Sequence, residues 1–271
     1  MSTIQTNDYR IQTDQGGLFV RRWSPGADGF GAEPPIVLLH DSLGCVELWR
    51  DFPAHLAAAT GRDVIAYDRL GFGRSDPHPG TLPPLHFIRN EADEGFRSVR
   101  EALALERFVL FGHSVGGGMA VACAARYPSA CAGLISESAQ MYAEDRTLNG
   151  IREAKQAFSD PVQVQRLAKY HGDKAEWVLH AWIDSWLAPE FASWSLDEEL
   201  GQVRSPVLSL HGDTDEYGSV DHPARIASLA PGDVTVHILP ACGHVPHREQ
   251  EDVVLEHILA WPVIGRTAIA R

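Results

Sequence analysis

A serine flanked by glycines directly follows a short apolar run in residues 108–118, whose sequence is Phe-Val-Leu-Phe-Gly-His-Ser-Val-Gly-Gly-Gly. The run predicts a buried strand, and the apolar pattern after the glycines has the period of a helix. A strand-to-helix turn that exposes a serine hydroxyl needs small residues on both sides, because its tight backbone leaves no room for side chains. Gly112 and Gly116 stand at those two places and make Ser114 a candidate nucleophile. A serine in a turn can also act only as a helix cap, so the rest of the chain has to decide between the two roles.

Similar apolar runs, bounded by Gly, Pro or Asp, recur along the chain and alternate with amphipathic segments of helical period. Strands that are covered on both faces need this continuous hydrophobicity, and their alternation with helices predicts an α/β fold with a mostly parallel, doubly wound sheet. Residues 9–13 and 17–23 instead alternate polar and apolar side chains, which predicts an antiparallel hairpin at the sheet edge. The other expected strands are 36–39, 64–67, 108–111, 133–135, 207–210 and 234–239, and the expected helices are 49–59, 88–105, 119–127 and 253–261.

One interval, residues 140–204, has no strand pattern and holds helical segments rich in aromatic residues. An insertion of this length between two strands predicts a helical cap over the carboxyl ends of the sheet. The expected organisation is one core domain, residues 1–139 and 205–271, into which the cap is inserted. Trp182 and Trp186 share one helical face, where they are expected to pack the cap, to line a ligand pocket, or both.

The charge balance restricts the possible partners. The formal net charge is −13 and Lys and Arg form no cluster, which argues against nucleic acid and against an anionic membrane surface. The first nine residues lack the basic and apolar segments of a signal peptide, and no apolar run approaches ~20 residues. The four cysteines have no metal-ligand spacing and are expected to be structural thiols. We expect a cytoplasmic protein, monomer or homodimer, that takes a small-molecule substrate and needs no cofactor.

A nucleophilic serine needs a histidine that accepts its proton and a carboxylate that orients the imidazole. The sequence His-Gly-Asp-Thr-Asp, residues 211–215, follows the strand at 207–210, and Gly243-His244 follows the strand at 234–239. Both loops lie after the carboxyl ends of their strands, which is the sheet edge where Ser114 is also expected. The three groups are therefore expected to converge, with Asp213 and Asp215 both open as the acid. A zinc site at His244-x-x-His247 would lack the Glu of a helical zinc motif, and no metal is expected.

A family resemblance is carried by the serine turn, by the two loops just described, by Leu-Leu-His-Asp at residues 38–41 and by Asp-Arg-Leu-Gly-Phe-Gly-Arg-Ser-Asp at residues 68–76. Through these motifs the chain resembles the α/β-hydrolase superfamily, in its branch of small capped esterases, lactonases and carbon–carbon bond hydrolases. The resemblance spans nearly the whole chain and implies an eight-stranded sheet with a helical cap. It selects Asp215 over Asp213 as the acid and His244 over His247 as the base. His247 is expected near the pocket rather than in the reaction.

The resemblance also implies an oxyanion hole made by two backbone N–H groups, those of Val115 and Ser42, with Leu43 as the alternative to Ser42. Asp41 departs from the family pattern, because relatives usually have glycine there. A carboxylate beside a developing oxyanion repels it unless the carboxylate points away or is paired, for which Arg74 or a histidine is available.

Carboxylic ester hydrolysis through an acyl-enzyme is the expected reaction, because it demands only the triad and the oxyanion hole. Lactone hydrolysis, carbon–carbon bond hydrolysis of a dienoic diketone and cofactor-free perhydrolysis, which resembles haloperoxidase activity in relatives, stay open. Aspartate-dependent dehalogenases and epoxide hydrolases are excluded, since they need a carboxylate at Ser114. A small-molecule receptor on the same fold is the alternative of another class. The side chains expected to contact the substrate are His40, His113, Trp182 and Trp186.

Overall fold

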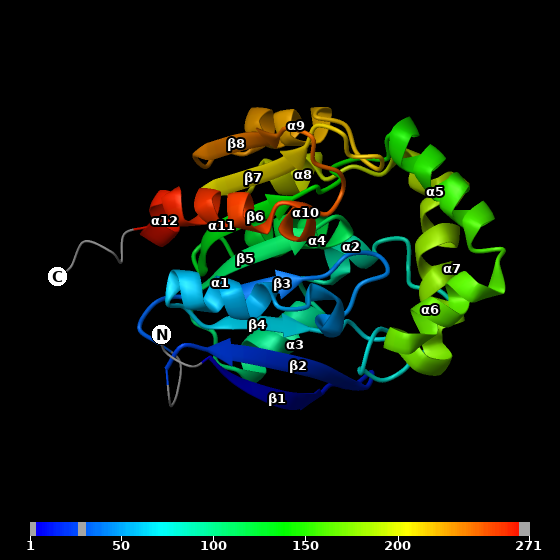
Figure 1. The fold of residues 1–271 in the computed structure, drawn as a ribbon, viewed down its shortest axis with the longest axis horizontal. Helices are drawn as coiled ribbons and strands as arrows, with labels where there is room; N and C mark the ends of the chain where they lie inside the picture. The colour runs from blue at the N-terminus through cyan, green and yellow to red at the C-terminus, as the bar shows by residue number, and fades with distance from the viewer. Residues whose placement is uncertain (1–3, 27–30, 266–271) are drawn as a thin grey trace.

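The computed structural model describes residues 4–26 and 31–265; residues 1–3, 27–30 and 266–271, which include the first residues of the polar start, lie outside that description. An eight-stranded sheet with the order β1-β2-β4-β3-β5-β6-β7-β8 runs through the centre (Figure 1). Strands β1 and β2 are antiparallel to each other, β2 is antiparallel to β4, and all other neighbours are parallel. The strands are β1 (Gln5–Gln12), β2 (Gly17–Ser24), β3 (Ile36–Leu39), β4 (Val64–Tyr67), β5 (Phe108–His113), β6 (Cys131–Glu137), β7 (Val207–Gly212) and β8 (Val234–Leu239).

The burial of the strands follows their place in the sheet. Every residue of β3, β4, β5 and β7 is buried, whereas the two edge strands β1 and β8 expose much of their length. Continuous apolar runs are required in the middle because helices cover both faces there. This confirms the α/β class and the mostly parallel, doubly wound sheet that the alternating pattern predicts.

One apolar core lies on each face of the sheet. The first holds Phe52 and Leu56 of α1 (Phe52–Thr60) with Val254 and Ile258 of α11 (Glu251–Ala260). The second lies under α2 (Phe87–Asn90), α3 (Gly95–Ala102), α4 (Val115–Arg126) and α9 (Asp221–Leu229). Shorter segments complete the core region: η1 (Val46–Trp49), α10 (Pro246–Glu249) and α12 (Pro262–Gly265).

The single helix expected over residues 88–105 is wrong, because the chain forms two helices, α2 and α3, with a break between them. Glu91 lies at the break, is buried, and accepts a hydrogen bond of 2.5 Å from the Tyr67 hydroxyl. A Cβ at Gly95 would stand 2.3 Å from Oε1 of Glu91, so a larger residue there would require this buried carboxylate to shift. The break thus coincides with a buried carboxylate, which hydrophobic periodicity does not register.

The helical insertion, by which we mean residues 140–204, connects β6 to β7. Its helices α5 (Asp145–Ala157), α6 (Pro161–His171) and α7 (Ala175–Trp186) lie beyond the carboxyl ends of the parallel strands, at the right of Figure 1. The segments η2 (Gly172–Lys174), η3 (Pro189–Ser193) and α8 (Asp197–Leu200) complete it. Its limits as a separate cap domain stay a prediction. Among the described residues, no helix combines the length and apolar character needed to cross a membrane.

Candidate active site

Ser114 occupies the turn between β5 and α4 with a positive φ of 55°, a backbone conformation that residues other than glycine rarely adopt. Two glycines make this turn possible. A Cβ at Gly112 would stand 2.2 Å from the carbonyl oxygen of Gly116, and a Cβ at Gly116 would stand 2.1 Å from that of Leu39. The sequence pattern around Ser114 therefore has a steric cause, since α4 must begin in contact with β3. For the same reason α4 begins at Val115, four residues earlier than the expected start at residue 119.

Ser114, His244 and Asp215 form a continuous hydrogen-bonded chain. Oγ of Ser114 lies 2.9 Å from Nε2 of His244, and Nδ1 of the same ring lies 2.9 Å from both carboxylate oxygens of Asp215. The imidazole thus contacts the hydroxyl on one side and a carboxylate on the other, which is the geometry that lets a histidine remove a serine proton.

The loop after β7 prepares Asp215 as an acceptor. The backbone N–H groups of Tyr217 and Gly218 donate to its Oδ1 at 2.7 and 3.1 Å, and the residue is buried. Burial works to raise the pKa of this carboxyl, but the hydrogen bond and charge of His244 outweigh it and hold the pKa below its usual range. Asp213 is exposed and does not reach the histidine. The structure thus places Asp215, of the two aspartates, beside His244.

A second histidine–carboxylate pair supports the His244 loop from behind. Nε2 of His113 donates to the backbone carbonyl of His244 at 2.8 Å, and its Nδ1 lies 3.4 Å from Asp41. Burial alone would lower the pKa of His113, but the hydrogen bond to Asp41 and the nearby charge of Glu137 raise it to about 9. Asp41 is thus paired with a protonated histidine. Arg74 is not its partner, because that side chain bonds to Asp8 instead.

His40 does not face the substrate, which corrects the expectation for this residue. It is buried, its Nδ1 donates to the carbonyl of Asp41 at 2.8 Å, and its Nε2 accepts from the backbone N–H of Arg69 at 3.2 Å. Both ring nitrogens hold backbone segments together. Burial first, and the charge of Arg69 next, keep the pKa of His40 well below its ordinary value, so the ring is neutral.

His247 is buried behind the site, where its Nδ1 lies 2.5 Å from Oε2 of Glu137. In the described part of the chain, His113, Glu137 and His247 form the one group of three side chains whose ligand atoms come close enough to hold a metal ion. Both ring nitrogens of His113, Nδ1 of His247 and Oε2 of Glu137 already contact protein groups, so a metal at these atoms would have to displace those contacts, whereas Oε1 of Glu137 is buried without a hydrogen-bond partner among the described residues. The arrangement is that of a hydrogen-bonded support for the neighbouring loops.

Two backbone N–H groups beside the nucleophile, one following it in the chain and one lining the same cavity, have no hydrogen-bond partner among the described residues. Val115 is the first residue of α4, where the N–H has no acceptor within the helix. Within residues 4–26 and 31–265, the Ser42 N–H forms no hydrogen bond, whereas the Leu43 N–H donates to Oδ1 of Asp41 at 2.8 Å. Asp41 thus occupies the alternative donor, Leu43, and leaves Ser42 available.

A cavity of about 160 Å³ opens at Ser114. Trp182 and Trp186 line it, as does the ring of His113, whose nitrogens point to protein groups. Gln140, which the sequence analysis missed, places Oε1 3.4 Å from Oγ of Ser114. It lies just after β6, at the same carboxyl edge as the triad loops, and this position was the signal that could have found it. The other lining residues are Asp41, Ser42, Leu43, Thr147, Ile151, Tyr217, His244 and Val245.

Comparison with known proteins agrees with this architecture. The family profile described as the alpha/beta hydrolase fold matches residues 34–162. The pig protein 1-acylglycerol-3-phosphate O-acyltransferase ABHD5 is 39% identical over 101 residues, which are 37% of this chain and 28% of the pig protein. The chain thus matches less than a third of the length of this and the similar mammalian relatives.

Two solved structures show the same fold at low identity. The proline iminopeptidase of Mycobacterium smegmatis superimposes with a TM-score of 0.72 at 22% identity, covering 94% of this chain and 99% of the other. The carboxylesterase CesB of Bacillus subtilis gives 0.68 at 20% identity, covering 96% and 92%. The sequence match over residues 34–162, the order of the strands and the serine turn between β5 and α4 together show that the chain has the α/β-hydrolase fold.

Proposed function

We propose that the protein is a serine hydrolase that cleaves carboxylic esters of small hydrophobic or aromatic substrates. The observation that carries the proposal is the chain of contacts from Ser114 through His244 to Asp215 at the wall of the 160 Å³ cavity. Both tryptophans of α7 that line the cavity present apolar surface, which suits an apolar acyl or alcohol group. The carboxylesterase and peptidase among the structural relatives are compatible with acyl transfer in this fold.

In the proposed first step, Oγ of Ser114 attacks the ester carbonyl as its proton passes to Nε2 of His244. A C–O bond to Ser114 forms, and the tetrahedral oxyanion lies between the N–H groups of Val115 and Ser42. The bond to the leaving alcohol then breaks as His244 returns the proton to that oxygen. Removing one such donor typically costs ~3 kcal/mol of transition-state stabilisation.

In the second step, His244 takes a proton from water, the hydroxide attacks the acyl group, and Ser114 is released with the carboxylic acid. Asp215 keeps the imidazole oriented and stabilises its charged form throughout. The negative charge of Asp41 would repel the oxyanion if it were unpaired. Its pairing with the His113 imidazolium reduces this repulsion.

The test is hydrolysis of p-nitrophenyl esters from acetate to octanoate by the unchanged protein and by Ser114→Ala, with mass spectrometry of the trapped acyl adduct. We expect turnover with an adduct on Ser114, and loss of both in the variant. No turnover by a folded, unchanged protein, together with tight binding of an ester, would instead support a receptor. Turnover of a proline p-nitroanilide in preference to every ester would replace the esterase with a peptidase.

A further inference from the structure

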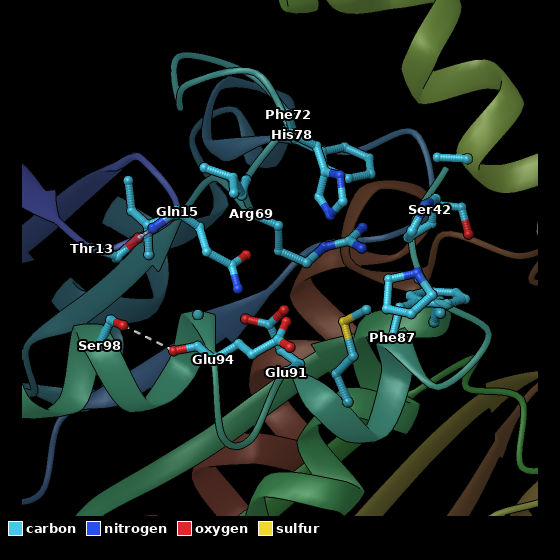
Figure 2. A pocket seen from close by; sticks show the side chains of 18 of the residues that line it. Thr13, Gln15, Ser42, Arg69, Phe72, His78, Phe87, Glu91, Glu94 and Ser98 are labelled. Atoms are coloured by element: carbon cyan, nitrogen blue, oxygen red, sulfur yellow. Dashed lines mark hydrogen bonds between the residues drawn. The ribbon is translucent and has the colours of Figure 1, made fainter. Parts of the chain in front are cut away.

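A second cavity, of about 130 Å³, adjoins the catalytic one (Figure 2). Ser42, Trp182 and Trp186 line both cavities, and Val115 lines the second as well as following the nucleophile. The second cavity therefore extends from the region where the oxyanion would form. A substrate whose carbonyl lies at Ser114 has room for a further group there.

Arg69 is the buried cation of this second cavity. Its residue is only 7% exposed, and Figure 2 shows its side chain extending across the middle of the cavity, between Phe72 and His78 on one side and Glu91 on the other. Its Nε has no hydrogen-bond acceptor, and no carboxylate of the described residues comes within salt-bridge distance of its guanidinium. Nε1 of Trp186 is a second buried donor without an acceptor.

The guanidinium is held in place by contacts that leave that donor free. Nη2 donates to the carbonyl of Asp41 at 2.8 Å and lies 3.3 Å from Nδ1 of His40, while Cζ lies 4.1 Å from the ring centre of Phe72. Burial lowers the pKa of Arg69, but an arginine stays protonated even so. A buried charge with an unfilled donor is costly unless a ligand supplies the acceptor.

Acidic side chains also line the second cavity, and their negative charges oppose the binding of an anion. Glu91 is the buried one; burial raises its pKa, and its Oε1 already accepts the Tyr67 hydroxyl. Glu94 and Asp14 are exposed residues of its lining, as is the cation Arg97. The guanidinium of Arg69 is thus the buried cation that an entering acceptor would meet.

We propose that this cavity binds a carboxylate of the substrate at the guanidinium of Arg69, so that the preferred esters are monoesters of dicarboxylic acids. This inference rests on the proposed esterase function. The guanidinium supplies both the charge and the directed N–H that a carboxylate prefers.

The experiment compares the mono-p-nitrophenyl esters of adipic, pimelic and suberic acids with the p-nitrophenyl methyl diesters of the same acids. Each diester keeps the p-nitrophenyl leaving group and the diacid chain, but its second carboxyl is a methyl ester and carries no charge. We expect kcat/KM for the best monoester to exceed that of its methyl diester at least tenfold. In Arg69→Met this ratio falls to about one, and in Arg69→Lys it stays between the two values. Arg126→Met removes an equal charge at the surface, outside both cavities, and leaves the ratio unchanged. A ratio of one or below in the unchanged protein overturns the inference.

Binding separates failure of the inference from failure of the proposed function. Calorimetry with monomethyl adipate on Ser114→Ala is expected to show binding that Ser114→Ala/Arg69→Met lacks, with circular dichroism to verify that both variants fold. If esters are hydrolysed without preference for the charged series, the esterase stands and the carboxylate site is wrong. If no ester is hydrolysed but this binding depends on Arg69, the site stands and the esterase is wrong. Equal binding by both folded variants also overturns the inference.

Discussion

The sheet core and the helical insertion contribute different things to the same cavity. The core supplies every group of the proposed reaction from the loops after β3, β5, β7 and β8. The insertion supplies Thr147, Ile151, Trp182 and Trp186, which shape the wall, and its first residue, Gln140, places Oε1 3.4 Å from Oγ of Ser114. Their packing differs too: β3, β4 and β5 are wholly buried, whereas α6 buries two residues, Leu167 and His171.

From this difference we expect substitutions in the core to alter the rate for every ester, and substitutions in the insertion to alter which ester is preferred. Hydrogen bonds also cross this division: Nε2 of His171 in the insertion, for example, lies 2.9 Å from the carbonyl of Leu43, next to Ser42. The insertion is therefore also bonded to the loop that carries one proposed oxyanion donor.

The largest effect is expected from Asp215→Asn in the core. An amide cannot hold the His244 imidazole in the same tautomer, so kcat should fall about 10⁴-fold for acetate and octanoate esters alike. Stopped-flow or steady-state hydrolysis measures it. Asp213→Asn, on the exposed neighbour, is the matched control and should keep kcat within about twofold. A loss confined to long esters would contradict the division of roles.

Gly116→Ala should destabilise the core by about 3 kcal/mol, because the new Cβ would stand 2.1 and 2.6 Å from the carbonyl oxygens of Leu39 and His40. Urea unfolding followed by circular dichroism gives the free energy of unfolding. Gly201→Ala in the insertion meets nothing nearer than 3.5 Å and should change stability by less than about 0.5 kcal/mol. Equal effects at both glycines would show that the turn tolerates a side chain.

Trp182→Ala in the insertion should raise the octanoate-to-acetate ratio of kcat/KM about tenfold, since it enlarges the cavity beside the apolar wall. The acetate rate should change by less than about threefold. Hydrolysis of the ester series measures both quantities, and Val162→Ala on the exposed surface of α6 is the control. If Trp182→Ala instead slows all esters equally, the insertion takes part in the reaction itself.

The smallest effect concerns pH and the pair of Asp41 with His113. The pKa of His113 is raised from 6.5 to about 9, so its stabilising contribution is complete below pH 6.5 and is lost as the pH rises through about 9. Asp41→Asn should flatten this loss, which we expect to be about 1 kcal/mol because Asp41 is partly exposed. Urea unfolding at pH 6 and pH 9.5 tests it. An unchanged pH slope in the variant would show that Asp41 does not hold the proton on His113.

Sequence periodicity predicted the strands of the core well, because a strand that is buried on both faces consists of a continuous run of apolar residues. It failed at residues 88–105, where the helix is interrupted at the buried Glu91, which is hydrogen-bonded to Tyr67 of β4. The sequence also provided no indication of Gln140, and His40 was expected to contact the substrate. Both errors concern where a polar side chain points, which depends on neighbours distant in the chain.

The sequence by itself determined the class of fold, the serine turn and the set of groups that meet at the carboxyl edge of the sheet, because these depend on local sterics and on burial along each strand. The resemblance to known hydrolases already selected Asp215 over Asp213. Only the tertiary structure decided that Asp41 pairs with His113 rather than Arg74, and that Arg69 lies with a free donor in a second cavity. Hydrogen bonds and charges act between side chains that folding brings together, so their pairing has no record in local sequence pattern.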